Sequence, residues 1–207
     1  MKNDFNKVAN VYDALVKLVF GKKLAIAQQT WLPEIQEGSR VLVMGGGTGK
    51  ILEWLFETRN ELNVVYVEAA EKMLEQTQKR QFPKAQVELI LGTESDIPSG
   101  SYDYIITNFF LDVFKPQKLE SICQQLHSIL KEGGHLICTD FRETGKFRHQ
   151  LTIALMHWFF RAVSGLESSK LQDLQAQLVN TGFRLQGEKQ YSRGLVFSGL
   201  YQKSITE

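Results

Sequence analysis

The stretch Val41-Leu42-Val43-Met44-Gly45-Gly46-Gly47-Thr48-Gly49-Lys50 decides the fold class of this chain. Its first four residues are apolar and include two β-branched side chains, which is typical of a buried strand. The glycines that follow tolerate positive φ angles and let other groups approach the backbone closely. A helical pattern begins at Thr48. The stretch therefore predicts a buried strand, a glycine turn and a helix in direct succession.

Alternating strand and helix patterns continue on the carboxyl side of this stretch. Strands separated by helices of this length indicate a parallel, doubly wound sheet with helices on both faces. A turn at Gly133-Gly134 should lead into the last parallel strand. We expect helices over residues 22–36, 48–59, 70–81, 116–130 and 170–180, and parallel strands over residues 41–44, 64–67, 87–91, 102–107 and 135–139.

The C-terminal part breaks the alternation, because two strand patterns, 183–188 and 194–201, are joined by a short connection. Such a pair predicts an antiparallel hairpin at one end of the sheet. The fold class is therefore α/β, a Rossmann-like, doubly wound, seven-stranded sheet, mostly parallel with a C-terminal antiparallel hairpin. We expect a single domain made of N-terminal cap helices (1–37), a cofactor-binding core (38–141), a lid helix insert (142–166) and a C-terminal helix and hairpin (167–207).

Composition and charge narrow the class of protein. The 207 residues carry a formal net charge of +1 at pH 7, which argues against general attraction to nucleic acid or anionic membranes. The N-terminus lacks the apolar run of a signal peptide, and the longest apolar stretch, 151–160, is too short to span a bilayer. Two cysteines are too few for a disulfide framework. We expect a cytoplasmic monomer or homodimer with a small-molecule substrate, no nucleic-acid partner and no integral membrane association.

The spacing of the glycines separates three kinds of nucleotide site. A P-loop requires glycine where Met44 stands, and serine or threonine where Ile51 stands. A dinucleotide fingerprint that starts at Gly45 requires glycine where Lys50 stands. A nucleotide-dependent oxidoreductase is therefore the least favoured of the three functions that we consider. The observed spacing, Gly45-x-Gly47-x-Gly49, suits a ligand without a pyrophosphate whose methionine part lies against the loop.

A carboxylate follows the second predicted strand. Glu68 comes directly after the apolar run 64–67, so it should lie beside the glycine loop at the carboxyl edge of the sheet. Open α/β sheets bind ligands at this edge, and a carboxylate there can accept both hydroxyl protons of a ribose. The alternative is a tight turn with no ligand and a surface glutamate. We favour a ligand site because the loop and the acid occur together.

With these residues in view, the chain resembles the class I S-adenosylmethionine-dependent methyltransferases over about residues 41–141. The glycine stretch resembles the first motif of that family, and residues 67–70 resemble its second. Residues 92–105 are similar to its adenine-side loop and fourth strand, and residues 130–134 to the turn before its fifth strand. The resemblance implies S-adenosylmethionine as cofactor, with Gly45, Gly46, Gly47 and Gly49 on the methionine and sugar, Glu68 and its neighbour Ala69 at the ribose, Thr93 and Glu94 near the adenine, and Asn108 by the methionine and sulfonium.

Two positions depart from the family's pattern. Val43, two residues before the loop, stands where the family often has an acid. Thr93 stands where an aspartate commonly reads the adenine amino group, although its hydroxyl or the neighbouring Glu94 can substitute. These departures keep a second interpretation open, a non-catalytic protein that binds S-adenosylmethionine or S-adenosylhomocysteine.

The substrate side is less specific. Phe5, Val8-Ala9 and Tyr12-Asp13 resemble the opening of ubiquinone/menaquinone-biosynthesis C-methyltransferases, which implies a quinone-like acceptor, although any amphipathic cap helix shares the apolar positions. Residues 151–163 are apolar around almost the whole helix, whereas a surface helix would show a polar face. This helix is interpreted as a lid over an apolar or aromatic acceptor, with ordinary core and a dimer contact as alternatives.

Methyl transfer from a sulfonium is an in-line displacement, so the protein must align the two reactants and exclude water. A phenol or enol-carbon acceptor also needs a base, for which Asp112 and His157 are candidates, with His149 as a rival. Tyr12 is a candidate for orienting a substrate hydroxyl. Each of these four residues also has a purely structural interpretation. No metal is expected, because the four histidines lack the spacing of a zinc site.

Overall fold

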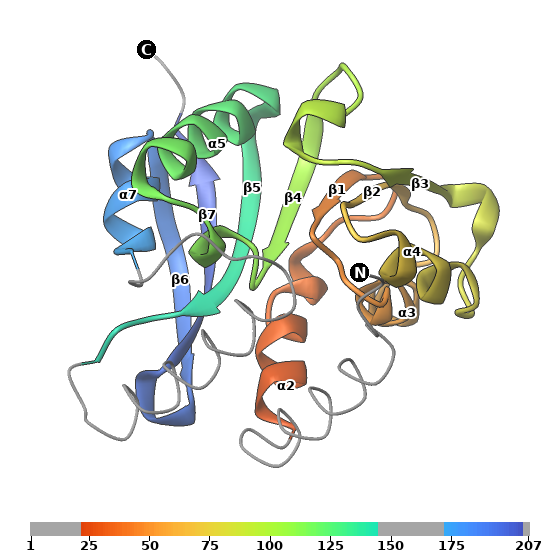
Figure 1. Ribbon diagram of the computed structural model, residues 1–207, viewed down its shortest axis with the longest axis horizontal. Helices are drawn as coiled ribbons and strands as arrows, with labels where there is room; N and C mark the ends of the chain where they lie inside the picture. Colours follow the sequence, from red (N-terminus) through yellow and green to blue (C-terminus); the bar gives the residue numbers. More distant parts are fainter. Residues whose placement is uncertain (1–21, 145–171, 205–207) are drawn as a thin grey trace, which may run out of the picture.

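The computed structural model describes residues 22–144 and 172–204. They form a seven-stranded sheet in the order β3-β2-β1-β4-β5-β7-β6 (Figure 1). Strands β1 to β5 run parallel to one another, and β7 is antiparallel to both of its neighbours. The predicted fold class and C-terminal hairpin are confirmed. The strands are β1 (Arg40–Met44), β2 (Asn63–Glu68), β3 (Val87–Leu91), β4 (Tyr102–Asn108), β5 (Leu130–Phe141), β6 (Phe183–Tyr191) and β7 (Val196–Lys203).

The helices lie close to their predicted positions, with one exception. The expected helix over residues 22–36 ends early, because Pro33 lacks an N–H donor and disfavours helical backbone in the residue before it. A short 3₁₀ helix, Leu32–Glu34, contains that proline instead. The α-helices are α2 (Lys23–Gln29), α3 (Lys50–Thr58), α4 (Glu71–Gln78), α5 (Pro116–Ile129) and α7 (Leu174–Asn180).

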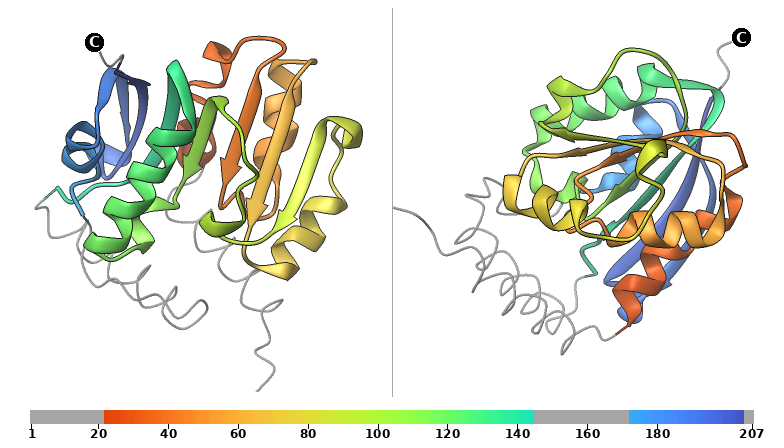
Figure 2. Two further views of the ribbon diagram at one scale, coloured as in Figure 1. Left: turned by 90° about the horizontal axis from the view of Figure 1, so that it is seen from above. Right: turned by 90° about the vertical axis from the view of Figure 1, so that its right-hand side faces the viewer.

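Alternate residues of each central strand point to opposite faces of the sheet, which creates two hydrophobic cores. α5 and α7 cover one face, while α3 and α4 cover the other (Figure 2). In β1, Leu42 and Met44 pack on the α5 side, and Val41 and Val43 pack on the α3 side. Val43 is therefore a core residue whose side chain is 1% exposed, which explains why an apolar residue stands there.

Gly133-Gly134 lies within β5 and not in a turn that precedes it. Tyr102 pairs with Leu130 and Tyr104 pairs with His135, so β5 carries extra residues between these two pairs. A Cβ on Gly134 would lie 2.9 Å from the carbonyl oxygen of Lys131. The strand therefore begins earlier than predicted, and glycine is required where its backbone folds closely on itself.

The strand register brings the starts of three loops to one edge of the sheet. Met44 of β1 pairs with Val67 of β2 and with Thr107 of β4. The next residues, Gly45, Glu68 and Asn108, therefore follow at the carboxyl ends of three neighbouring strands. This is the edge at which open α/β sheets bind ligands.

The cap helices predicted for residues 1–21 and most of the predicted lid insert lie outside the described residues. Within the part that the structure describes, no helix is long and apolar enough to cross a membrane. The two cysteines are buried thiols. Cys123 lies in α5 and Cys138 in β5, in the core on the α5 side of the sheet.

The packing of α5 gives a test of this core. Leu126 is fully buried between α5 and the sheet, so Leu126→Ala removes apolar contacts and leaves a cavity. We expect the free energy of unfolding to fall by about 2–4 kcal/mol, measured by urea denaturation. Ser121→Ala on the exposed side of the same helix is the control and should change it by less than about 0.5 kcal/mol. Equal effects of the two substitutions would contradict the assignment of the buried face.

Candidate functional site

The glycine loop between β1 and α3 packs closely against side chains from other parts of the chain. A Cβ on Gly46 would lie 2.2 Å from the ring of Tyr66, and one on Gly49 would lie 2.5 Å from Thr77. A Cβ on Gly45 would lie 2.6 Å from the ring of Phe110. Three of the four glycines are thus required by close contact with protein side chains.

Gly47 differs from the other three glycines of the loop. Its φ angle is +62°, in the left-handed region that favours glycine, and a Cβ there would meet nothing within 4 Å. The open side of the loop is therefore at Gly47. This is where a ligand has room to approach the backbone.

Side chains from β2 and α4 hold the carbonyl groups of the loop. The hydroxyl of Tyr66 donates to the carbonyl oxygen of Gly47 at 2.9 Å, and the hydroxyl of Thr77 lies 3.1 Å from the same oxygen. Arg80 donates to the carbonyl oxygen of Thr48, and to its side-chain hydroxyl at 3.1 Å. The conformation of the loop is thus tied to β2 and to α4 and the residues just after it.

Glu68 lies against the glycine loop, as the sequence predicts. Gly47 donates its backbone N–H to one carboxylate oxygen at 2.8 Å, and Ala70 donates to the other at 2.9 Å. Burial raises the pKa of Glu68, opposed by the hydrogen bonds from Ala70 and Gly47. Each carboxylate oxygen retains acceptor capacity beyond its one backbone partner, so the pair can also receive hydroxyl groups. Ala69, the next residue, is exposed beside it.

The predicted adenine-side residues point in different directions. Thr93 is exposed and begins a short 3₁₀ helix, Glu94–Asp96, where its N–H donates to Asp96 at 2.8 Å. Glu94 forms an ion pair with Lys118 of α5. Asp96 thus accepts both the N–H and the hydroxyl of Thr93, a contact that sequence spacing did not single out.

Asn108 ends β4 next to the glycine loop, and its side-chain amide is buried without a partner. Neither its oxygen nor its nitrogen has a hydrogen bond among the described residues. Leaving a buried polar group unpaired costs about 1–3 kcal/mol, which a ligand's polar atoms would recover. Asn108 is therefore a candidate ligand contact.

Asp112 forms a buried pair with Asp140 at the end of β5. The side chains hydrogen-bond to each other, and Asp140 also accepts the backbone N–H groups of Leu111 at 3.1 Å and Phe141 at 2.9 Å. Burial raises the pKa of Asp112 to about 6 and that of Asp140 well above its usual range, where the negative charge of Asp112 adds to the effect. Both shifts favour a protonated carboxyl group in the pair.

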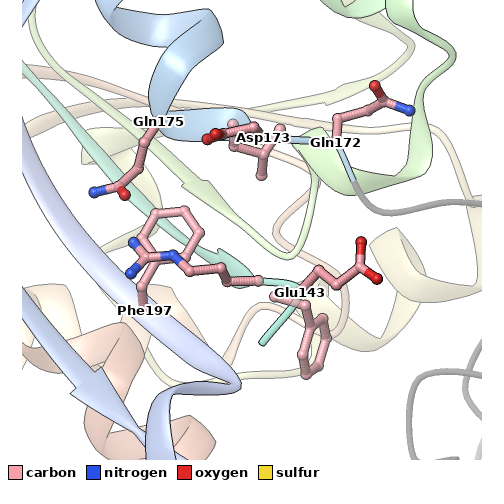
Figure 3. Close-up of a pocket in the computed structure, with 8 residues that line it drawn as sticks. Glu143, Gln172, Asp173, Gln175 and Phe197 are labelled. Atoms are coloured by element: carbon pink, nitrogen blue, oxygen red, sulfur yellow. The ribbon is translucent and has the colours of Figure 1, made fainter. Parts of the chain in front are cut away.

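A cavity of about 410 Å³ opens farther along the same edge, between the end of β5 and the start of α7 (Figure 3). Phe141, Phe197 and Leu174 form its apolar wall. Arg142 also lines it and is neutralised by an ion pair with Glu188. The ring of Phe141 contacts that of Phe109, with centroids 4.9 Å apart, which connects the cavity to the end of β4. Its polar lining residues are Arg142, Glu143, Gln172, Asp173 and Gln175.

The structure leaves some predicted residues without a test and adds others. Tyr12, His149 and His157 lie outside the described residues, so their catalytic roles stay predictions. Across residues 22–144 and 172–204, no group of histidine, cysteine and carboxylate side chains is arranged to hold a metal ion. The sequence analysis missed the residues that support the loop and the carboxyl pair, because in the sequence they resemble ordinary core or helix positions: Tyr66, Thr77, Arg80, Phe110 and Asp140.

Comparison with known proteins finds a family model that matches the central part of the chain. Residues 41–134 match the family model described as a methyltransferase domain. Carboxy-S-adenosyl-L-methionine synthase from Campylobacter fetus subsp. fetus (strain 82-40) is 25% identical over 128 residues, which are 61% of this chain and 50% of the relative. This chain thus spans about half the length of that relative. The matches confirm the resemblance to S-adenosylmethionine-dependent methyltransferases and the class of cofactor.

Solved structures share the fold. A complex between the Haloferax volcanii Trm112 methyltransferase activator and a methyltransferase contains a chain that is 12% identical, with a TM-score of 0.72 over 99% of this chain and 100% of that chain. The mitomycin 7-O-methyltransferase MmcR is 16% identical, with a TM-score of 0.67 over 89% of this chain and 55% of its own. At these identities the similarity concerns the fold alone.

The carboxyl pair predicts a specific pH dependence of stability. Because the folded state holds protons that the unfolded state releases near pH 4, the pair's contribution to the free energy of unfolding falls as pH rises toward about 6. Asp112→Asn removes one titrating group, so its stability relative to the wild type should increase by about 1–3 kcal/mol across this range, measured by urea denaturation at several pH values. Glu120→Gln, on the exposed face of α5, is the control. A relative stability of Asp112→Asn that does not vary with pH would contradict the shared proton.

Proposed function

We propose that this chain, whose residues 41–134 are a methyltransferase domain, is an enzyme that transfers the methyl group of S-adenosylmethionine to a small aromatic acceptor. The observation that carries the proposal is the hydrogen bond of 2.8 Å between Glu68 and the backbone of Gly47. It joins a carboxylate suited to a ribose with the one open position of the glycine loop.

The residues of this edge fit the cofactor. Gly47 offers the open backbone for the methionine and sugar, Glu68 retains acceptor capacity for ribose hydroxyls, and the unpaired amide of Asn108 offers both a donor and an acceptor. Thr93, with Asp96 behind it, would lie on the adenine side. S-adenosylmethionine supplies an electrophilic methyl group, so the protein's own task is to hold and align the reactants.

The acceptor is proposed to occupy the cavity at the end of β5. Its volume is within the usual range for small-molecule sites, about 300–1,000 Å³. Phe141 would contact an aromatic ring, together with Phe197 and the guanidinium of Arg142 that lies 4.7 Å from the centroid of the Phe197 ring. The other polar side chains that line the cavity would bind the substituents of that ring. This lining favours an aromatic acceptor with hydrogen-bonding groups over a purely apolar one. A quinol or phenol satisfies both requirements.

Asp112 remains the candidate base among the described residues. A carboxyl group with a pKa of about 6 can accept a proton near neutral pH, and an ordinary aspartate is a weaker base. Its partner Asp140 is held by backbone N–H groups and would keep the Asp112 carboxyl in place. His157 and Tyr12 remain proposals for the same steps.

Two rival functions guide the choice of experiment. The apolar Val43 and the exposed Thr93 favour a protein that binds the cofactor without turnover. The name of the Campylobacter relative favours an enzyme that modifies S-adenosylmethionine itself. The three functions differ in their products, because only methyl transfer yields S-adenosylhomocysteine together with a methylated acceptor.

A pair of glycine substitutions tests the cofactor site. Gly47→Ala and Gly38→Ala each place a Cβ at a positive φ angle with nothing within 4 Å, so both pay a similar backbone strain of about 1–2 kcal/mol. Only Gly47→Ala puts a methyl group where the cofactor is proposed to lie. Calorimetric titration with S-adenosylhomocysteine should show at least a tenfold loss of affinity, about 1.4 kcal/mol, for Gly47→Ala and little change for Gly38→Ala. Wild-type binding of NAD but not of S-adenosylhomocysteine would overturn the proposal.

A methyl-transfer assay tests the acceptor class. The protein is incubated with methyl-labelled S-adenosylmethionine and a panel of phenols, quinols and aliphatic alcohols, and the products are identified by mass spectrometry. We expect methylated aromatic products, and Phe197→Leu should lower kcat/KM at least fivefold without changing the affinity for S-adenosylhomocysteine. Leu185→Ala, an exposed apolar residue of β6, is the control. Binding without any product would favour the non-catalytic rival. A mass increase on S-adenosylmethionine, in a parallel incubation to which small carboxylic acids are added as carboxyl donors, would favour the synthase rival.

A further inference from the structure

Two side chains of β2 form hydrogen bonds with the backbone of Gly47, one with its N–H and one with its carbonyl oxygen. Tyr66 and Glu68 are two residues apart in this strand, so their side chains lie on the same face. Glu68 accepts the N–H of Gly47 at 2.8 Å, and Tyr66 donates to the carbonyl oxygen of Gly47 at 2.9 Å. The residue that faces open space is thus oriented by two side chains of one strand.

Counting protons shows that the two hydroxyl groups near this carbonyl have different roles. The hydroxyl of Tyr66 has Gly47 as its backbone acceptor. The hydroxyl of Thr77 lies 3.1 Å from the carbonyl oxygen of Gly47 and 3.0 Å from that of Met73, and its one proton can serve only one of them at a time. The two hydroxyl groups also lie 3.4 Å from each other, and either can donate in that contact. Tyr66, whose contact with the carbonyl of Gly47 is the shorter, is assigned as its main donor, and Thr77 as a second donor that can take its place.

Both side chains also shape the loop through their bulk. Tyr66 and Thr77 are fully buried, and they fill the space that a Cβ on Gly46 or Gly49 would need. They pack against Gly46 and Gly49, and the space next to Gly47 stays open. Their hydroxyl groups are directed at the carbonyl oxygen of Gly47.

We propose that Tyr66 and Thr77 are positioning residues, which hold Gly47 in the conformation that receives the cofactor. The N–H and the carbonyl of Gly47, a residue at φ +62°, belong to two successive peptide planes, and each plane can rotate unless its own group is held. Rotation of the plane that carries the carbonyl would shift the backbone at the open side of Gly47 and disturb its proposed contact with the cofactor. This inference rests on the proposed function, because it assumes that the open side of Gly47 is the cofactor site.

Conservative substitutions isolate the hydroxyl groups. Tyr66→Phe keeps the ring beneath Gly46, and Thr77→Val keeps the branched side chain beneath Gly49. Tyr104→Phe is the matched control, because Tyr104 is another buried tyrosine whose hydroxyl donates to a backbone carbonyl, that of Glu34 at 2.8 Å. It removes the same kind of hydrogen bond, but one that does not touch the loop.

The affinity of each variant for S-adenosylhomocysteine is measured by calorimetry, at a temperature where thermal denaturation shows that all of them are folded. We expect Tyr66→Phe to weaken binding about fivefold and Thr77→Val about twofold, because either hydroxyl can still hold Gly47. The double variant should lose more than the product of these two factors, since no donor remains. Tyr104→Phe should lower the melting temperature to a similar degree as Tyr66→Phe and leave the affinity unchanged.

The outcomes separate the two hypotheses. Failure of the wild-type protein to bind S-adenosylhomocysteine would overturn the proposed function. Binding by the wild type, with Tyr66→Phe and the double variant within twofold of it, would overturn the positioning role alone. Equal weakening by Tyr104→Phe and Tyr66→Phe would also overturn it, because general destabilisation would then explain the loss. If the double variant does not fold, the comparison of Tyr66→Phe with Tyr104→Phe decides whether Tyr66 has a positioning role.

Discussion

The constraint on which this site depends is the fixed orientation of the backbone at Gly47. A residue at positive φ that faces open space has no side chain of its own to hold it in place. Hydrogen bonds from β2 supply what is missing, because Glu68 binds the N–H and Tyr66 binds the carbonyl. The open residue of the loop is thereby held at both its N–H and its carbonyl group.

The carboxyl edge of the sheet divides into two regions with different chemistry. Around β1, β2 and β4, backbone groups and a single carboxylate offer directional hydrogen bonds, which suits a polar nucleoside. Around β5 and β7, aromatic rings line a cavity whose cation is already neutralised by Glu188. The buried pair of Asp112 and Asp140 links the end of β5 to the loop after β4. One edge of the sheet thus provides a polar binding region, an aromatic cavity and a pair of carboxyl groups.

Local patterns in the sequence were sufficient for the strands and for most of the helices. Apolar runs such as 64–67 indicate a central strand in any doubly wound sheet, since both faces of such a strand are buried. Prediction failed where neighbouring contacts override local preference. The pair Gly133-Gly134 has the composition of a turn, yet it lies inside β5, because Leu130 before it already pairs with Tyr102 of β4. The ion pair of Glu94 with Lys118 of α5 likewise joins residues far apart in the chain, so no local pattern indicated it.

The sequence by itself determined the order of strands and helices, the glycine loop and the acid that follows it, because each depends on residues close together in the chain. Only the tertiary structure decided what the glycines are for, since three of them make room for Tyr66, Thr77 and Phe110 and only Gly47 is left open. The same holds for the pairing of Asp112, in the connection after β4, with Asp140 of β5. Such contacts join residues tens of positions apart, and the register of the sheet brings them together without leaving a periodic signal in the chain.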